Sequence, residues 1–261
     1  MGDFKFKKKF GQNFLKDKKI IKNIVDCANI DEDSLVIEVG PGKGILTEQL
    51  SKKAKRVLCY EIDLDLENIL TEKFDNSNVQ VIYDDFLNRN ISEDIKNYNC
   101  KKIYFVSNVP YYITTPILLK LIESNVDIEK IVIMVQKEVG ERFSAKTGTK
   151  NYGSITVFLN YYYDIKNEFN VNRNEFEPVP NVDSVVISFT KRQNKYKVNN
   201  QKKFFELVRD SFKYKRKNIK NNLKNYDLEI INNILLENNL SLSSRAEQIP
   251  IDVFIKISNS L

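Results

Sequence analysis

The sequence predicts an α/β protein whose larger part is a Rossmann-like parallel sheet and whose smaller, C-terminal part is all helical. Three observations predict this fold. Short apolar runs alternate with helical patterns over the first 190 residues, a glycine-rich turn follows the first run, and only helical patterns occur after residue 191. Strands that alternate with amphipathic helices are typical of a parallel sheet covered on both faces. We expect domains at 1–194 and 195–261, separated within a polar stretch.

The elements follow in order along the chain. The predicted strands are residues 34–39, 56–61, 79–83, 102–106, 131–135 and 182–190. The predicted helices of the first domain are residues 45–54, residues 64–74 and a segment after Thr114-Thr115-Pro116. Beyond the boundary, apolar residues at three- and four-residue spacing predict helices at 204–223, 228–238 and 253–257.

Composition excludes several classes of function. The 261 residues include no His, so the chain has no Ser-His-Asp triad, no His-containing zinc site and no imidazole base. Its three cysteines, Cys27, Cys59 and Cys100, lack the spacing of a metal site and are too few for a disulfide framework. No apolar run reaches the roughly 18 residues of a membrane span. We expect a soluble cytoplasmic protein with no metal and no membrane contact.

Charge is unevenly distributed along the chain. Residues 1–22 carry a net charge of +6, residues 23–190 carry −8, and residues 191–261 carry +8. Two basic ends around an acidic middle fit an enzyme that binds a polyanion and has a separate reaction site. The alternative is that the lysines are solvated surface residues of a Lys-rich protein.

A glycine loop, Gly40-Pro41-Gly42-Lys43-Gly44, lies between the first predicted strand and the helix that follows. Its Gly-x-Gly-x-Gly spacing is neither that of dinucleotide sites nor that of a P-loop. Glu61 ends the second strand, where an acid accepts hydrogen bonds from ribose hydroxyls, and Asp85 follows the third strand, where it can accept an adenine amino group. Together these features suit S-adenosylmethionine. The alternative is an ordinary tight turn with two surface acids.

The segment Asn108-Val109-Pro110-Tyr111 follows the fourth strand at its carboxyl end, where sites in such sheets form. The Asn108 side-chain oxygen and the Val109 carbonyl can each accept one hydrogen from an adenine N6 amine, which favours a nucleophilic, pyramidal nitrogen. Pro110 fixes φ and orients that carbonyl. Tyr111 offers an aromatic face to an extruded base. The alternative is a turn at the end of a strand.

With these motifs in place, nearly the whole chain resembles the rRNA adenine N6,N6-dimethyltransferases. The segment Phe10-Gly11-Gln12-Asn13-Phe14-Leu15 is similar to the family's N-terminal motif, which folds over the cofactor. The resemblance implies a Rossmann-like methyltransferase domain that contacts S-adenosylmethionine through six residues: Asn13, Leu15, Gly40, Glu61, Asp85 and Asn108. Asn13 and Leu15 enter this set through the resemblance alone.

Two branches of this family differ in substrate. One dimethylates two adjacent adenines near the 3′ end of small-subunit (16S) rRNA, and the other modifies one large-subunit adenine and confers macrolide resistance. The segments Phe212-Lys213-Tyr214-Lys215-Arg216-Lys217 and Ser244-Arg245-Ala246-Glu247-Gln248 resemble the small-subunit branch. The resemblance therefore implies 16S rRNA or a pre-30S particle as the partner and a role in small-subunit biogenesis. We expect the enzyme to be a monomer.

The sequence departs from the family pattern at three positions, Val109, Tyr112 and Thr114. The family more often has Leu or Ile at the first, Asn at the second and Ser at the third. The contact expected from Val109 uses its backbone carbonyl, so this departure leaves the chemistry intact.

Five basic residues that the sequence places on the helix 204–223 are expected to contact rRNA phosphates. Such contacts position a protein on RNA without reading its sequence. The five residues are Lys213, Lys215, Arg216, Lys217 and Lys220.

Three other functions remain open at this point. The chain could be a macrolide-resistance methyltransferase, a relative that binds nucleic acid without catalysis, or a nucleotide-dependent oxidoreductase on a similar sheet. The intact glycine loop and the Asn108–Tyr111 motif argue against a non-catalytic relative. The same motif and the glycine spacing argue against an oxidoreductase.

Overall fold

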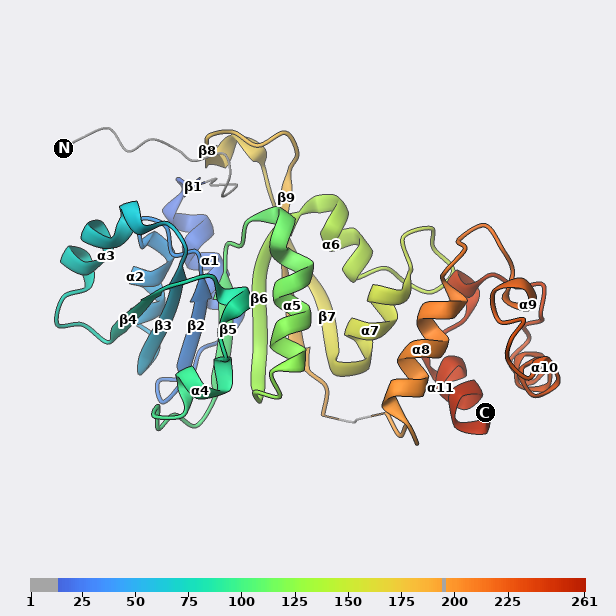
Figure 1. The fold of residues 1–261 in the computed structure, drawn as a ribbon. Coiled ribbons are helices and arrows are strands. Elements are labelled where there is room, and N and C mark those ends of the chain that lie inside the picture. The colour runs from blue at the N-terminus through green and yellow to red at the C-terminus, as the bar shows by residue number, and fades with distance from the viewer. Residues whose placement is uncertain (1–13, 194–195) are drawn as a thin grey trace. The chain divides into compact units, whose positions relative to one another are not determined.

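The computed structural model describes residues 14–193 and 196–261, so the expected cofactor contact Asn13 lies outside the described residues. Seven strands form one sheet in the order β4-β3-β2-β5-β6-β9-β7, and β1 pairs with β8 in a separate two-stranded sheet (Figure 1). The neighbouring strands from β4 to β6 are parallel, and β9 is antiparallel to β6.

The strands are β1 Phe14–Leu15, β2 Leu35–Val39, β3 Arg56–Glu61, β4 Val79–Tyr83, β5 Ile103–Ser107, β6 Ile128–Gln136, β7 Tyr163–Val171, β8 Phe176–Glu177 and β9 Ser184–Lys191. The helices are α1 Lys18–Ala28, α2 Ile45–Ser51, α3 Glu67–Phe74, α4 Ile91–Ile95, α5 Thr114–Glu123, α6 Lys137–Phe143, α7 Ser154–Tyr162, α8 Gln201–Ser211, α9 Ile219–Asn222, α10 Leu228–Glu237 and α11 Ile251–Ser260.

The central strands are buried on both faces because helices cover both sides of the sheet. All five residues of β2 are buried, and Figure 1 shows α1 and α2 on one face of the sheet and α5 on the other. Helix α1 is capped at its start by Asp17, whose carboxylate accepts a hydrogen bond from the N–H of Lys19, and at its end by Asn29 in the left-handed conformation. Its apolar side packs against the sheet through Ile21 and Ile24.

The chain divides into two compact units. The first contains residues 1–140 and 166–190 and holds most of the sheet, and the second contains residues 141–165 and 191–261. The core of the second unit is formed by helices α7, α8, α9, α10 and α11, and Phe204 and Phe254 are fully buried in it. The sequence placed residues 141–165 in the first domain, whereas in the structure α7 packs with the C-terminal helices. The division into functional domains at 1–194 and 195–261 remains a prediction.

Most predicted elements are present, and β3 and β4 have the predicted bounds. The fold class is confirmed as an α/β Rossmann-like sheet followed by helices. The sequence analysis missed helices α1, α4, α6 and α7 and strands β1, β7 and β8. Strand β7 was missed because only its first and last residues are buried, so it lacks the apolar run that marked the other strands.

The predicted continuous helix at 204–223 is wrong. Helix α8 ends at Ser211, residues 212–218 form turns, and α9 begins at Ile219. A continuous helix would place Lys213 beside Lys217, and like charges four residues apart destabilise a helix. The side chain of Asn222 instead stabilises the turns, because its amide donates to the carbonyls of Ser211 and Tyr214 at 2.7 and 3.3 Å.

Candidate functional site

A cavity of about 350 Å³ opens at the carboxyl ends of β2, β3, β4 and β5 in the first unit. The strand order reverses between β2 and β5, and ligands of open α/β sheets bind at this switch point. The structure brings together at this cavity every described residue for which a cofactor or catalytic role was predicted. These residues are Leu15, Gly40, Glu61, Asp85, Asn108, Val109, Pro110 and Tyr111.

The glycine loop forms one wall of the cavity and needs glycine at defined positions. Gly40 has φ +70° and donates its N–H to the carbonyl of Tyr60 at 2.8 Å, which fixes the loop to β3. Gly44 has φ +72°, and a Cβ there would lie 2.6 Å from the Phe74 ring. A side chain at Gly44 would therefore strain the backbone and collide with α3.

Glu61 lies at the end of β3 and is only 4% exposed. Its carboxylate accepts hydrogen bonds from the N–H groups of Gly42 at 3.1 Å and Asp63 at 2.9 Å. Burial raises the pKa of Glu61, although these backbone hydrogen bonds act in the opposite direction. A carboxylate has about four acceptor positions, so the two bonds orient the group and leave capacity for hydroxyl donors in the cavity.

A second acid, Glu38, is fully buried beneath the glycine loop and also lines the cavity. Burial raises the pKa of Glu38 to about 8, and the neighbouring charge of Glu61 adds to this rise. The thiol of Cys59 donates to its carboxylate at 3.7 Å. The proton on Glu38 at neutral pH keeps two acids from being charged side by side.

Asp85 follows β4 and caps a short 3₁₀ turn, Phe86–Asn88. One of its carboxylate oxygens accepts the N–H of Leu87 at 2.9 Å. Its own N–H donates to the carboxylate of Asp84 at 2.8 Å. Both aspartates line the cavity, so this turn forms the wall next to the one formed by Glu61.

The Asn108–Tyr111 segment begins where β5 ends. The Ser107 hydroxyl donates to the carbonyl of Val39, which joins the ends of β5 and β2 across the switch point. The Tyr111 hydroxyl shares a 2.7 Å hydrogen bond with Ser184 on β9, and burial raises the pKa of Tyr111. The ring of Tyr111 is thereby held at the cavity, whereas the adjacent Tyr112 is 61% exposed.

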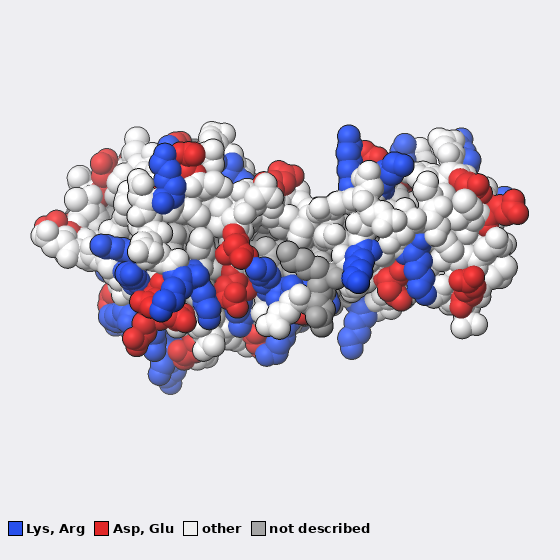
Figure 2. Space-filling view, turned by 90° about the horizontal axis from the view of Figure 1, so that it is seen from below, with Lys and Arg blue, Asp and Glu red and all other residues white. Residues whose placement is uncertain are grey.

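The five basic residues predicted to contact RNA lie in the second unit, and their surroundings differ from the prediction. Lys213, Lys215, Arg216 and Lys217 are exposed on the turns of residues 212–218, which we call the basic loop, and Lys220 is exposed on α9. Tyr214, also exposed, lies in the same loop. Figure 2 shows basic side chains on the surface of both units with acidic ones among them, so charge alone does not single out one face in this view.

Sequence reasoning missed Glu38 and Tyr60 as cavity residues and did not consider Arg89 at all. Alternation along β3 turns the Tyr60 side chain to the face opposite that of Glu61, so the strand pattern gave no signal that Tyr60 lines the cavity. Within residues 14–193 and 196–261, no group of three or more acids and cysteines is arranged to hold a metal. No helix in the described part of the chain has the length and apolar character needed to span a membrane.

Comparisons with known proteins agree with this geometry. The sequence profile of the family described as "Ribosomal RNA adenine dimethylase" matches residues 3–261. A protein of Staphylococcus aureus (strain JH9), named ribosomal RNA small subunit methyltransferase A, is 43% identical, and the match covers 97% of this chain and 89% of that protein.

Two solved structures resemble the fold across nearly the whole chain. A dimethyladenosine transferase from Plasmodium falciparum has a TM-score of 0.77 at 25% identity and covers 94% of this chain and 95% of its own. The 23S rRNA methyltransferase ErmE has a TM-score of 0.77 at 26% identity and covers 94% of this chain and 97% of its own.

Proposed function

The chain belongs to the ribosomal RNA adenine dimethylase family, and from this premise we infer that it methylates N6 of two adjacent adenines near the 3′ end of 16S rRNA. The methyl donor is S-adenosylmethionine. The observation that carries the inference is that a single cavity gathers the glycine loop, the acids Glu61 and Asp85 and the Asn108–Tyr111 segment.

The donor set of the cavity fits S-adenosylmethionine. The carboxylate of Glu61 is oriented by two backbone N–H groups and has acceptor capacity for a ribose diol. Asp85 accepts one backbone hydrogen bond and is available to an adenine amino group on the next wall. Leu15 is buried at the cavity and provides an apolar contact. Asn13, outside the described residues, completes the proposed set.

The reaction needs an amine lone pair aimed at a carbon electrophile. S-adenosylmethionine, when bound, supplies a sulfonium methyl group. The Asn108 side-chain oxygen and the Val109 carbonyl each accept one N6–H, which withdraws the lone pair from the adenine ring and directs it into the cavity. Pro110, at φ −55°, fixes the direction of the preceding carbonyl. The methylated amine is cationic and loses its proton to water, so no histidine is required.

Tyr111 is the proposed platform for the target adenine. Its hydroxyl is held by Ser184, so the ring keeps one orientation at the cavity before RNA binds. A base stacked on an aromatic ring gains about 1–3 kcal/mol. This gain offsets part of the cost of removing the adenine from its stack.

The small-subunit substrate is favoured by sequence. One of the two similar solved structures is named a dimethyladenosine transferase and the other a 23S rRNA methyltransferase, and both match with the same TM-score, so the fold does not separate these two activities. The 43% identical relative is named for the small subunit. The basic loop, with Lys213, Lys215, Arg216 and Lys217, and Lys220 on α9 are the proposed phosphate contacts. We further propose a cytoplasmic monomer that uses no metal.

One incubation tests the proposal. Purified protein and tritiated S-adenosylmethionine are added to 30S particles, 50S particles and naked 16S rRNA, and the RNA is digested to nucleosides. We expect N6,N6-dimethyladenosine from small-subunit material only. Label in 50S particles would identify the macrolide-resistance activity instead. Binding of RNA without any transfer of label would identify a non-catalytic relative.

A further inference from the structure

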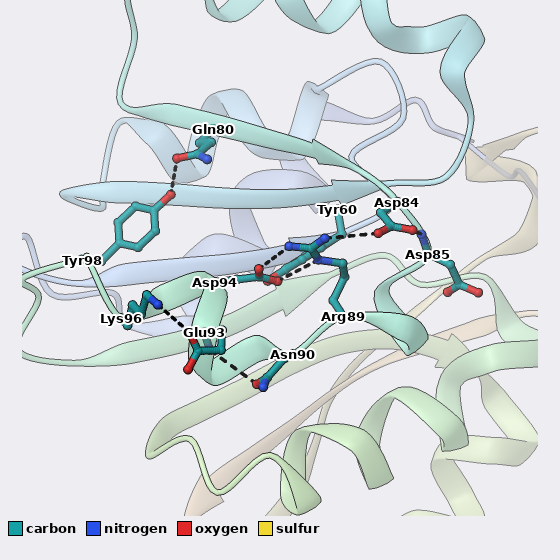
Figure 3. Close-up of polar contacts among 10 residues, drawn as sticks. All are labelled: Tyr60, Gln80, Asp84, Asp85, Arg89, Asn90, Glu93, Asp94, Lys96 and Tyr98. Atoms are coloured by element: carbon teal, nitrogen blue, oxygen red, sulfur yellow. Dashed lines mark hydrogen bonds and ion pairs between the residues drawn. The ribbon is translucent and has the colours of Figure 1, made fainter.

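A guanidinium outside the cavity connects two of its walls. Arg89 donates through Nη1 to Asp84 at 3.3 Å, and through Nε at 3.1 Å and Nη2 to Asp94. Figure 3 shows the guanidinium between the two carboxylates, with the Asp85 side chain turned away from it. A guanidinium has five donors in a rigid, planar arrangement, so it can hold two carboxylates at a fixed separation.

The first carboxylate leads to the turn that is proposed to recognise adenine. Asp84 accepts from Arg89 with one oxygen and from the N–H of Asp85 with the other, at 3.3 and 2.8 Å. Asp84 is 44% exposed and has no burial to hold it in place, so the bond to Arg89 restricts its position. The position of the Asp85 carboxylate at the cavity therefore depends on Arg89 through two consecutive hydrogen bonds.

The second carboxylate leads to an aromatic wall. Asp94 is 7% exposed, and one of its oxygens accepts from the Tyr60 hydroxyl at 3.0 Å. Tyr60 lines the cavity and packs edge-on against Phe86, with ring centroids 5.0 Å apart, and Phe86 lines the cavity too. Burial raises the pKa of Asp94, but the hydrogen bonds from Arg89 and Tyr60 outweigh it and the pKa is lowered. Asp94 thus stays charged and keeps both partners.

We propose that Arg89 is a positioning residue for the adenine half of S-adenosylmethionine, which sets the Asp84–Asp85 turn and the Tyr60–Phe86 wall at their working separation. The inference rests on the proposed function, because it takes Asp85 to accept the adenine N6 amine. Arg89 itself touches no substrate in this scheme. Arg89 thereby makes the site select adenine over a purine with an oxygen at position 6, because a correctly placed Asp85 carboxylate accepts from an amine and repels a carbonyl oxygen. A displaced carboxylate would do neither.

The test compares two product analogues by calorimetry. S-adenosylhomocysteine carries the N6 amine, and S-inosylhomocysteine carries an oxygen in its place. The wild type should bind the first ligand more tightly. In Arg89→Gln this preference should fall about tenfold, the scale of one hydrogen bond to a charged group. In turnover, KM for S-adenosylmethionine should rise while kcat changes little. Arg89→Lys, which keeps charge but loses the planar donors, should recover only part of the preference.

Two further variants keep the test decisive. Asp84→Asn weakens the link to the turn at a half-exposed carboxylate, so the variant should fold even where Arg89→Gln leaves buried Asp94 without its cation. It should lose the same preference. Lys96→Gln is the matched control. It removes an exposed, 2.6 Å ion pair between Lys96 and Glu93, which lies beside the same network (Figure 3). Neither residue of this pair lines the cavity. Lys96→Gln should leave both affinities unchanged.

Two results would overturn the inference. They are a preference in Arg89→Gln equal to that of the wild type, including the case in which both affinities fall equally, and a preference in Asp84→Asn equal to that of the wild type. An equal loss would mean that Arg89 only stabilises the fold. If the wild type bound neither ligand, the proposed function itself would fail, and the inference would fail with it.

Discussion

The cavity of the first unit and the basic loop of the second hold the side chains of the proposed sites by different means. Around the cavity, Glu61 is buried, its carboxylate is oriented by backbone N–H groups, and strand ends fix the surrounding segments. In the basic loop, Lys215, Arg216 and Lys217 are exposed on turns, and one side chain, Asn222, binds the loop backbone. The proposed function of the cavity therefore depends on geometry, whereas the proposed function of the loop depends mainly on charge.

The largest expected effect belongs to the cavity. Asn108→Ala should lower kcat about 10²–10³-fold, as expected when an oriented hydrogen-bond partner is lost from the reacting group. Affinity for 16S rRNA should change far less, because the interaction strengthens as the amine becomes pyramidal. Single-turnover kinetics and filter binding measure the two. Asn99→Ala, at an exposed position, is the control, and parallel losses of rate and binding would mean that Asn108 is structural.

Glu61→Ala should come next. It removes hydrogen bonds to the ribose diol from a charged group, so cofactor affinity should fall by about 1–3 kcal/mol in calorimetry. Because burial raises the pKa of Glu61, acidification should also weaken cofactor binding by wild type, as the carboxylate gains a proton and loses acceptor capacity. The exposed Glu67→Ala is the control, and an unchanged affinity in Glu61→Ala would remove Glu61 from the site.

The basic loop should show the opposite pattern. Replacing Lys215, Arg216 and Lys217 together by Gln should weaken 16S rRNA binding about tenfold. It should also flatten the plot of log affinity against log salt by about 0.7–0.9 for each phosphate that the variant no longer neutralises. Cofactor affinity should stay the same, because these residues do not line the cavity. A matched triple replacement at exposed Lys202, Lys203 and Lys224 controls for net charge. Identical slopes for the two triple variants would rule out a specific role for the loop.

The contrast also bears on what sequence can predict. The cavity was predictable because parallel strands place their carboxyl ends at one edge, so Gly40, Glu61, Asp85 and Asn108 were expected to converge once a parallel sheet was inferred. The bridge from Arg89 to Asp84 and Asp94 was not predictable, since no periodicity marks a guanidinium that binds two carboxylates. The positive charge of the basic loop was evident, but its backbone was not. Apolar spacing predicted a helix through Lys213 and Lys217, and like-charge repulsion together with the Asn222 bonds favours turns instead.

The pH dependence of stability should include a contribution from Glu38, which is buried at the cavity. The folded chain keeps a proton on Glu38 up to about pH 8, whereas the ordinary pKa of this side chain is 4.5. Between these values the folded state binds more protons, so the free energy of unfolding should fall as pH rises, by at most about 1.4 kcal/mol per pH unit. Glu38→Gln has no proton to lose and should flatten this dependence in urea unfolding from pH 6 to 9. Parallel pH profiles would show that Glu38 is charged in the folded state.

The smallest effect should come from loosening the basic loop without changing its charge. Asn222 binds the loop through its side chain: its amide donates to Ser211 and Tyr214, and its carbonyl accepts the N–H of Tyr214 at 3.2 Å. Asn222→Ala removes these bonds, so all basic residues remain but the loop samples more conformations. Ordering the loop on RNA should then cost more free energy, so the affinity for 16S rRNA should fall by about 1 kcal/mol, the net contribution of a neutral hydrogen bond.

The salt dependence separates this variant from the triple replacement. Asn222→Ala keeps its cations, so its affinity for 16S rRNA should be lower by the same factor at every salt concentration, with an unchanged slope. Asn221→Ala is the matched control, because its side chain is exposed one residue away. If Asn222→Ala flattened the slope as the triple replacement does, the loop's geometry would be needed to place its charges on phosphates. The two regions would then both depend on fixed backbone, and the contrast between them would be one of burial only.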